Sequence, residues 1–249
     1  MIVYPNAKIN LGLNVLRKRE DGYHDISSVF YPVKECVDIL EIIKSERFEF
    51  TRSGIEISDG ENICEKAWKL LDTDFGIGNV KIHLHKQIPI GAGLGGGSAD
   101  ASFTLKSLNE LFDLNLNNKE LEKYALRLGA DCPFFIDNTP KLVEGIGEKM
   151  TSIDLDLSDY EILLVNPDIH ISTKEAFSWV VPETPEQSIE QIIQLPLEEW
   201  KNKLKNDFEK SIFIKYPKLI DLKDKLYKEG AIYTSMTGSG SVIFGIFEK

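Results

Sequence analysis

Apolar and polar residues alternate strictly near the start of the chain. Apolar side chains occupy every second position from Ala7 to Val15, with Lys8 and Asn10 on the opposite face. This period of two predicts a half-buried strand. Residues 80–86, Val-Lys-Ile-His-Leu-His-Lys, alternate in the same way and predict another strand with one wet face.

Helical spacing and turn signals divide the rest of the chain. We expect helices over residues 62–71, 99–112, 117–128, 172–180, 197–205, 206–214 and 218–229, and strands over 27–33, within 36–58, over 160–167 and on either side of a small-residue loop in 231–245. Residues 182–196 read as a surface connection. An irregular, Asp-rich stretch at 151–160 places a domain boundary near residue 155, which gives domains 1–155 and 156–249.

Composition narrows the class of protein. The 249 residues are 42% hydrophobic and carry a formal net charge of -11, as expected for a soluble globular protein, and this charge argues against a nucleic-acid or anionic-membrane partner. Polar residues interrupt the N-terminal segment, so we expect no targeting peptide, and no apolar run reaches membrane-spanning length. Three cysteines without C-x-x-C spacing support neither a disulfide framework nor a zinc site. We therefore expect a cytoplasmic protein.

The stretch from Pro89 to Ser102 is rich in glycine and leads into a segment that can form a helix. Glycines allow positive φ and a close approach to bare amides, and a helix start leaves N–H donors at the positive end of its dipole. The stretch therefore reads as a phosphate loop. A glycine-rich turn without a ligand is the simpler alternative.

The loop departs from two better-known phosphate motifs. Gly91, Gly93 and Gly96 satisfy G-x-G-x-x-G, but a buried parallel strand and a following acidic residue are missing. Gly97 and Ser98 stand where a Walker loop has Lys and Ser or Thr. Phosphate charge must therefore be met by backbone amides, by Mg²⁺ and by basic residues from elsewhere.

Other candidate residues are ambiguous by pattern alone. Asp131 lies among apolar residues between Gly129 and Pro133, so it is either a helix cap or a buried carboxylate that needs a partner. Lys8 and Asn10 could simply line a solvated strand face. Packing or turn roles are the default for Tyr23, His24, Phe177, Thr237 and Gly238.

Several motifs, in order along the chain, resemble the GHMP kinase superfamily. Pro-Ile-Gly-Ala-Gly-Leu-Gly-Gly-Gly-Ser-Ala-Asp-Ala is similar to its phosphate motif, and the triple glycine and Asp21-Gly22-Tyr23-His24 resemble its 4-diphosphocytidyl-2-C-methyl-D-erythritol kinase branch. The other matching segments are Ala7-Lys8-Ile9-Asn10-Leu11, Gly-Ala-Asp-x-Pro-Phe-Phe from residue 129, Ser172-Thr173 with Phe177, and Met-Thr-Gly-Ser-Gly-Ser from residue 236. The resemblance implies an α+β, GHMP kinase-like two-domain fold with the active site in the interdomain cleft.

The resemblance also implies roles for individual residues. Lys8 and Asp131 are the implied catalytic pair. The implied ATP-binding residues are Pro89, Ile90, Gly91, Ala92, Gly93, Leu94, Gly95, Gly96, Gly97, Ser98 and Ala99, with Ser98 a weak candidate ligand of the Mg²⁺ that accompanies ATP. The implied substrate-binding residues are Asn10, Tyr23, His24, Phe177, Thr237 and Gly238.

The implied reaction is transfer of a phosphoryl group from ATP to the 2-hydroxyl of 4-diphosphocytidyl-2-C-methyl-D-erythritol, in the non-mevalonate (MEP pathway) synthesis of isoprenoid precursors. The alternative within the superfamily is a mevalonate or homoserine kinase. A dinucleotide oxidoreductase and a non-catalytic nucleotide sensor are the rival classes. We expect small-molecule partners only, and a monomer or weak homodimer.

Overall fold

The computed structural model describes residues 1–57 and 60–249, which form two compact units. Unit 1 contains residues 1–8, 32–90 and 95–139, and unit 2 contains residues 9–31, 91–94 and 140–249. The expected division after residue 155 differs from this arrangement, because strand β3 (His24–Val37) pairs with strand β7 (Lys141–Gly145). That pairing joins residues 9–31 to the C-terminal part of the chain.

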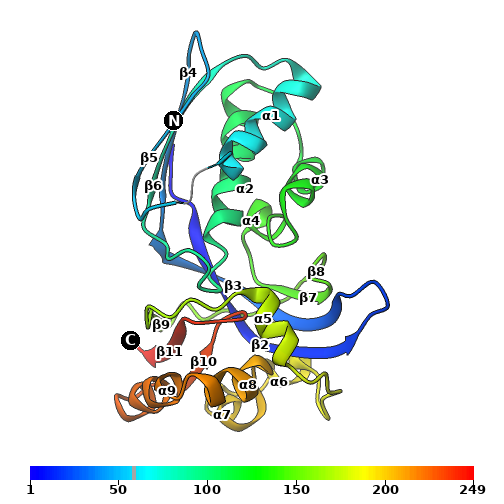
Figure 1. Ribbon diagram of the computed structural model, residues 1–249, viewed down its shortest axis with the longest axis vertical. Coiled ribbons are helices and arrows are strands. Elements are labelled where there is room, and N and C mark those ends of the chain that lie inside the picture. Colours follow the sequence, from blue (N-terminus) through cyan, green and yellow to red (C-terminus); the bar gives the residue numbers. More distant parts are fainter. Residues whose placement is uncertain (58–59) are drawn as a thin grey trace. The chain divides into compact units, whose positions relative to one another are not determined.

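Unit 1 is a sheet covered by helices. Its strands, in the order β1-β4-β6-β5, are β1 (Ile2–Val3), β4 (Ile39–Lys44), β6 (Val80–Lys86) and β5 (Glu49–Gly54). Helices α1 (Ile63–Phe75), α2 (Gly96–Leu111), α3 (Asn118–Leu128) and α4 (Phe134–Asp137) lie on one side of this sheet (Figure 1). Apolar side chains of β4 and β6 pack with those of α1, α2 and α3 in one core.

Capping residues explain where two of these helices begin. Asn62 and Asn117 each accept a backbone N–H at the helix start, and Glu65 and Glu120 complete the two capping boxes. These local signals confirm the expected starts of α1 and α3. The expected strand region at 36–58 extends onto residue 58, which lies outside the described residues.

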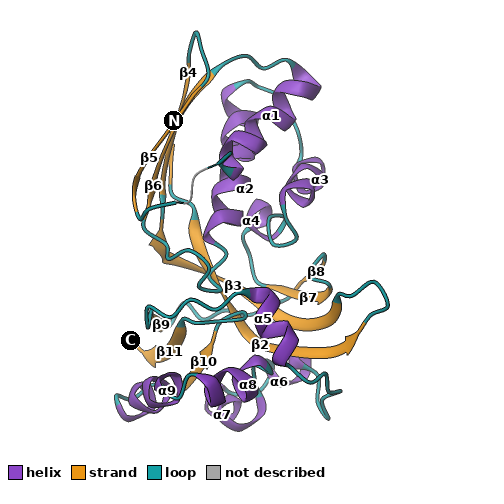
Figure 2. Cartoon of the chain, viewed as in Figure 1, coloured by secondary structure: helices purple, strands orange, loops and turns teal. Residues whose placement is uncertain are grey.

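Unit 2 combines two sheets with short helices (Figure 2). One sheet has the order β2-β3-β7-β8, where β2 spans Asn6–Lys18 and β8 spans Lys149–Ser152; the other has the order β10-β11-β9, from Tyr233–Met236, Ile243–Glu248 and Tyr160–Val165. The helices are α5 (Thr173–Trp179), α6 (Ile189–Ile192), the 3-10 turn η1 (Leu197–Glu199), α7 (Trp200–Lys203), α8 (Phe208–Lys215) and α9 (Lys218–Lys228).

Tertiary packing changed three expected elements. Strand β2 is buried on both faces from Asn6 to Val15, so the predicted wet face is absent from this described strand. Strand β9, expected to be buried, is only partly buried: its residues are half-buried or exposed. The helix expected over 197–205 begins as the 3-10 turn η1 and ends early, at Lys203 of the four-residue α7.

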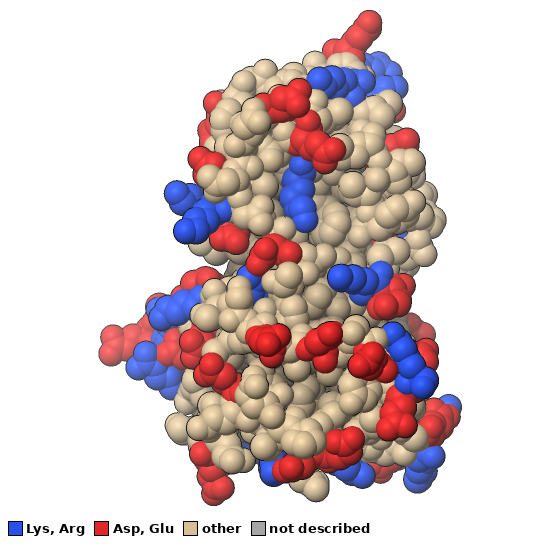
Figure 3. Space-filling view, turned by 180° about the vertical axis from the view of Figure 1, so that it is seen from behind, with Lys and Arg blue, Asp and Glu red and all other residues tan. Residues whose placement is uncertain are grey.

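Charged side chains of both signs share the surface. On the face seen in Figure 3, Asp and Glu side chains are numerous and interleaved with Lys and Arg. Within residues 1–57 and 60–249, no helix is long and apolar enough to cross a membrane.

The cap of α3 makes a testable contribution to stability. Replacing Asn117 by Ala removes the acceptor for the Glu120 N–H, and we expect a loss of about 0.5–2 kcal/mol in the free energy of unfolding. Asn118→Ala is the matched control, since Asn118 is exposed and follows the cap. Equal urea midpoints for the two variants would contradict this role of Asn117.

Candidate active site

Helix α2 begins inside the glycine stretch, three residues earlier than the expected start at Ala99. Gly95 is its first boundary residue, with φ of 70°, and no side chain of the described residues caps this end. The amides of Gly96, Gly97 and Ser98 therefore lie in the uncapped first turn. Such amides, at the positive end of a helix dipole, suit an anion.

Alternate glycines before the helix adopt backbone conformations that other residues resist. Gly91, Gly93 and Gly95 have φ of 67°, 80° and 70°. A Cβ on Gly93 would lie 2.2 Å from the carbonyl oxygen of Thr237, both in unit 2. The glycines thus serve close packing as well as backbone curvature.

Lys8 and Asp131 meet in unit 1. The Lys8 Nζ lies 3.6 Å from Asp131 Oδ2, and the two side chains are 4% and 35% exposed. Burial lowers the pKa of Lys8, and the neighbouring Asp131 carboxylate opposes that shift. A Cβ on Gly95 would lie 3.0 Å from Lys8 Cγ. The ion pair therefore lies beside the start of α2.

Asp131 is less buried than its sequence context predicts. The turn between α3 and α4 leaves the carboxylate about one-third exposed, although its neighbour Cys132 is fully buried. Burial raises the pKa of the Cys132 thiol to about 11, which fits a packed thiol and not a nucleophile.

Thr237 and Asn10 form a buried polar contact in unit 2. The Asn10 N–H donates to Thr237 Oγ1 at 3.1 Å. The Thr237 hydroxyl in turn lies 3.1 Å from the Gly93 carbonyl oxygen and 3.3 Å from Asn10 Oδ1. Gly238 is buried next to them and approaches Gly93 closely. These residues hold the glycine loop, and their expected contact with substrate stays a prediction.

Asn206 supports the same segment and was missed from the sequence. Its Nδ2 donates to the carbonyl oxygens of Met236 and Gly238 at 2.7 and 2.8 Å. A single Asn at the start of an expected helix reads as a cap, so the sequence offered no signal for this long-range role.

The segments carrying Tyr23, His24 and Phe177 are partly brought together in unit 2. The rings of His24 and Phe177 stack with centroids 4.9 Å apart and an interplanar angle of 22°. Burial lowers the pKa of His24, and nearby Lys18 adds to this shift. Tyr23 is 61% exposed. The exposed ring of Tyr23 therefore lies next in sequence to His24, whose ring stacks on Phe177.

Arg19 holds that turn and was also missed from the sequence. Its guanidinium pairs with Asp21 at 2.9 Å and with Asp25 at 3.1 Å, and the Tyr23 N–H donates to Asp21 Oδ1. The charged run preceding Gly22 reads as a solvated turn, so only the structure reveals this network.

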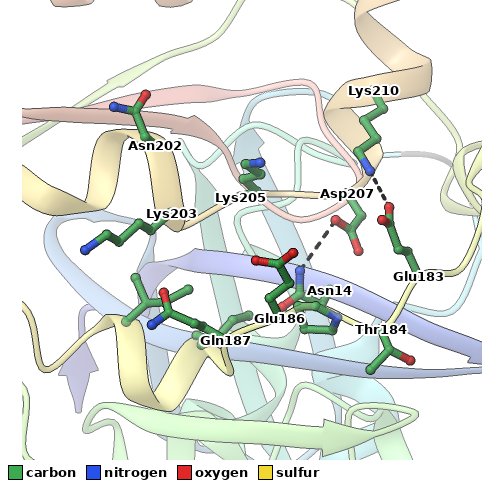
Figure 4. Close-up of a pocket in the computed structure, with 13 residues that line it drawn as sticks. Asn14, Glu183, Thr184, Glu186, Gln187, Asn202, Lys203, Lys205, Asp207 and Lys210 are labelled. Atoms are coloured by element: carbon green, nitrogen blue, oxygen red, sulfur yellow. Dashed lines mark hydrogen bonds and ion pairs between the residues drawn. The ribbon is translucent and has the colours of Figure 1, made fainter.

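A separate polar pocket of about 380 Å³ lies in unit 2 (Figure 4). Asp207 borders it and accepts hydrogen bonds from the Val15 N–H and the Asn14 side chain, while Lys210 pairs with Glu183 at 2.6 Å. The pocket is lined by Asn14, residues 183–187, Ile189, Ile192, Asn202, Lys203, Lys205, Asp207 and Lys210. The predicted catalytic and binding residues are not among these lining residues.

Comparison with known proteins defines the class. Residues 62–138 match the model for the GHMP kinases N terminal domain, and residues 185–249 match that for GHMP kinases C terminal. The Methanococcus jannaschii mevalonate kinase superposes with a TM-score of 0.72 at 16% identity, over 100% of this chain and 90% of that one. This distant likeness shows the fold alone. The chain has the α+β fold of the GHMP kinases.

Nearer relatives define the family. Proteins named 4-diphosphocytidyl-2-C-methyl-D-erythritol kinase from Bacteroides fragilis and Parabacteroides distasonis are 52% and 51% identical, over 99% and 100% of this chain and 92% of each relative. A crystal structure of 4-(cytidine 5'-diphospho)-2C-methyl-D-erythritol kinase superposes with a TM-score of 0.87 at 31% identity, over 99% of this chain and 90% of that one. This chain belongs to the 4-diphosphocytidyl-2-C-methyl-D-erythritol kinase family.

Adjacent glycines at the start of α2 provide a test of the phosphate loop. Gly97 is exposed, and a Cβ built on it meets no described atom within 4 Å, whereas one on Gly96 would lie 2.8 Å from the Ile88 side chain. We expect Gly97→Val to keep the melting temperature and to weaken ATP binding about tenfold or more, because its side chain enters the phosphate's approach. Gly96→Val should instead lower the melting temperature. Unchanged ATP affinity in a folded Gly97→Val protein would remove the loop from the site.

Proposed function

We propose that this chain transfers the γ-phosphoryl group of ATP to the 2-hydroxyl of 4-diphosphocytidyl-2-C-methyl-D-erythritol, a step of the non-mevalonate route to isoprenoid precursors. One observation carries the proposal. The Lys8–Asp131 ion pair lies beside Gly95, where an uncapped helix start offers amides to phosphate.

The residues of this pair divide the chemistry between them. Asp131, about one-third exposed, can receive the proton of the acceptor hydroxyl as a general base. Lys8 pairs with Asp131 and supplies positive charge near the transferred group. Phosphoryl transfer has a loose transition state, so the rate depends on the alignment of the acceptor hydroxyl as well as on its deprotonation.

ATP is the proposed ligand of residues 89–99. In the part of the chain that the structure describes, no cluster of three or more His, Cys, Asp or Glu side chains suits a metal ion. Mg²⁺ would accompany ATP, with Ser98 its predicted protein ligand. When bound, it neutralises charge on the phosphates.

The proposed acceptor carries a cytosine base, and the segment after Gly22 fits such a group. Tyr23 offers an exposed ring for stacking, and the His24 ring is fixed by its own stack on Phe177. Ring nitrogens of His24 can exchange hydrogen bonds with a base edge. Base recognition by these three residues is the feature that separates this family from kinases of simple alcohols.

Other features of the proposal rest on the sequence. A cytoplasmic location, a monomer or weak homodimer, and the lack of nucleic-acid and membrane partners stay predictions. A nucleotide sensor would keep the loop without needing a base and a lysine together, so ATP turnover with the acceptor discriminates between the two functions.

The role of Asp131 can be tested by an isosteric change. We expect Asp131→Asn to lower kcat by about 10²- to 10⁴-fold with little change in ATP affinity, because the base is lost while the shape is kept. The measurement is steady-state transfer from labelled ATP, with Asp113→Asn, an exposed site, as control. Near-normal turnover would show that alignment alone suffices.

Stacking by Tyr23 predicts a selective loss. Tyr23→Ala should raise KM for the cytidine substrate by about 5- to 150-fold and leave KM for ATP unchanged, since stacking one base is worth roughly 1–3 kcal/mol. Tyr23→Phe keeps the ring and should behave nearly as the natural protein. Tyr4→Ala is the surface control, because Tyr4 is 58% exposed against 61% for Tyr23. An unaltered KM in Tyr23→Ala would refute base recognition here.

A further inference from the structure

A second charged cluster of unit 1 lies entirely within its interior. Lys86 Nζ lies 2.5 Å from Asp38 Oδ2 and 2.6 Å from Asp100 Oδ2, and the three side chains are 4%, 0% and 2% exposed. Buried charges are costly unless they are paired. These residues have no chemical part in the proposed phosphoryl transfer. Their burial therefore needs a different explanation.

Asp38 fixes the chain immediately before the glycine loop. Its Oδ1 accepts the backbone N–H groups of Gln87 and Ile88 at 2.6 and 2.9 Å, while Oδ2 takes the Lys86 ammonium. One carboxylate therefore determines the direction in which the chain leaves β6.

The Lys86 ammonium connects this point to the helix that follows the loop. Its second partner, Asp100, lies in the second turn of α2. A Cβ on Gly96 would come within 2.9 Å of the same ammonium. Lys86 thus lies directly beneath the first turn of α2, the turn whose amides are uncapped.

We propose that Asp38, Lys86 and Asp100 are positioning residues for ATP, which hold the residues before the glycine loop against the start of α2. Without this connection the glycine-rich segment has many conformations, and ordering it on binding would cost affinity. The inference rests on the proposed function in one respect, namely that ATP is the ligand of the loop.

The charge balance of the cluster indicates which variant is informative. One ammonium faces two carboxylates, and burial together with Asp38 raises the pKa of Asp100 to about 7. Asp100 Oδ1 has no hydrogen-bond partner among the described residues. The thiol of Cys64 also lies near this carboxylate, and the Thr104 hydroxyl donates to the backbone carbonyl oxygen of Asp100. Removing Lys86 would strand two buried carboxylates, whereas replacing Asp100 leaves a balanced Lys86–Asp38 pair.

The test compares two uncharged substitutions at position 100, of which Asp100→Leu is also the bulkier. Asp100→Asn keeps an oxygen that can accept from Lys86, and Asp100→Leu does not. Both remove the surplus buried carboxylate, so both should melt within a few degrees of the natural protein at pH 8. We expect Asp100→Leu to raise the dissociation constant for ATP about tenfold, since a lost charge-assisted hydrogen bond is worth about that factor or more. Asp100→Asn should stay within about threefold.

Direct calorimetric titration with ATP and Mg²⁺ keeps this result separate from the identity of the acceptor. Leu84→Ala, which cuts the same strand's packing in the core, is the control for general destabilisation and should leave ATP affinity unchanged. If Asp100→Leu does not fold, Asp100→Ala removes the acceptor without added bulk. Equal ATP affinity of the Asn and Leu or Ala variants, or an equal loss in Leu84→Ala, would overturn the positioning role. Failure of the natural protein to bind ATP would instead refute the proposed function.

Discussion

A helix start that binds an anion must leave its amides free, so other interactions have to fix it. A capping side chain at Gly95 would compete with the ligand for those amides. In unit 1 the start of α2 is held from beneath by Lys86, which pairs with Asp100. In unit 2 the preceding loop is held by the hydroxyl of Thr237 against the carbonyl of Gly93. Neither the Lys86–Asp100 pair nor the Thr237–Gly93 hydrogen bond uses the amides at the start of α2.

Exposure distinguishes the Lys8–Asp131 pair from the Lys86 cluster, in line with the roles proposed for them. Asp131 is 35% exposed and pairs with one lysine, so a bound hydroxyl can reach its carboxylate. Asp100 is 2% exposed and lies under the helix, so its carboxylate has no route to a ligand. A pair that exchanges a proton with substrate must keep one partner accessible, whereas a pair that only holds backbone segments gains from exclusion of water.

Local signals in the sequence predicted local structure well. Asn62 and Asn117 marked helix starts because each Asn side chain caps a backbone N–H within three residues of itself. The start of α2 at Gly96 was missed, since glycine disfavours helix and the contacts that Gly96 makes with Lys86 and Ile88 form only on folding. The burial of β2 on both faces was also missed. Periodicity shows that apolar and polar residues alternate, but it does not show whether the polar side chains meet water or buried partners.

Candidate site residues within contiguous motifs could be proposed from the sequence, and they stay predictions. The residues that support those segments could not be proposed, because Asn206 and Arg19 meet their partners only on folding. Lys86 is different. Strand β6 buries alternate positions from Val80, and Lys86 falls on that apolar face and not on the wet face of His83 and His85. A lysine at an apolar position of a strand requires a buried counter-charge. The parity of β6 alone therefore predicts an acidic partner in the core next to the glycine loop.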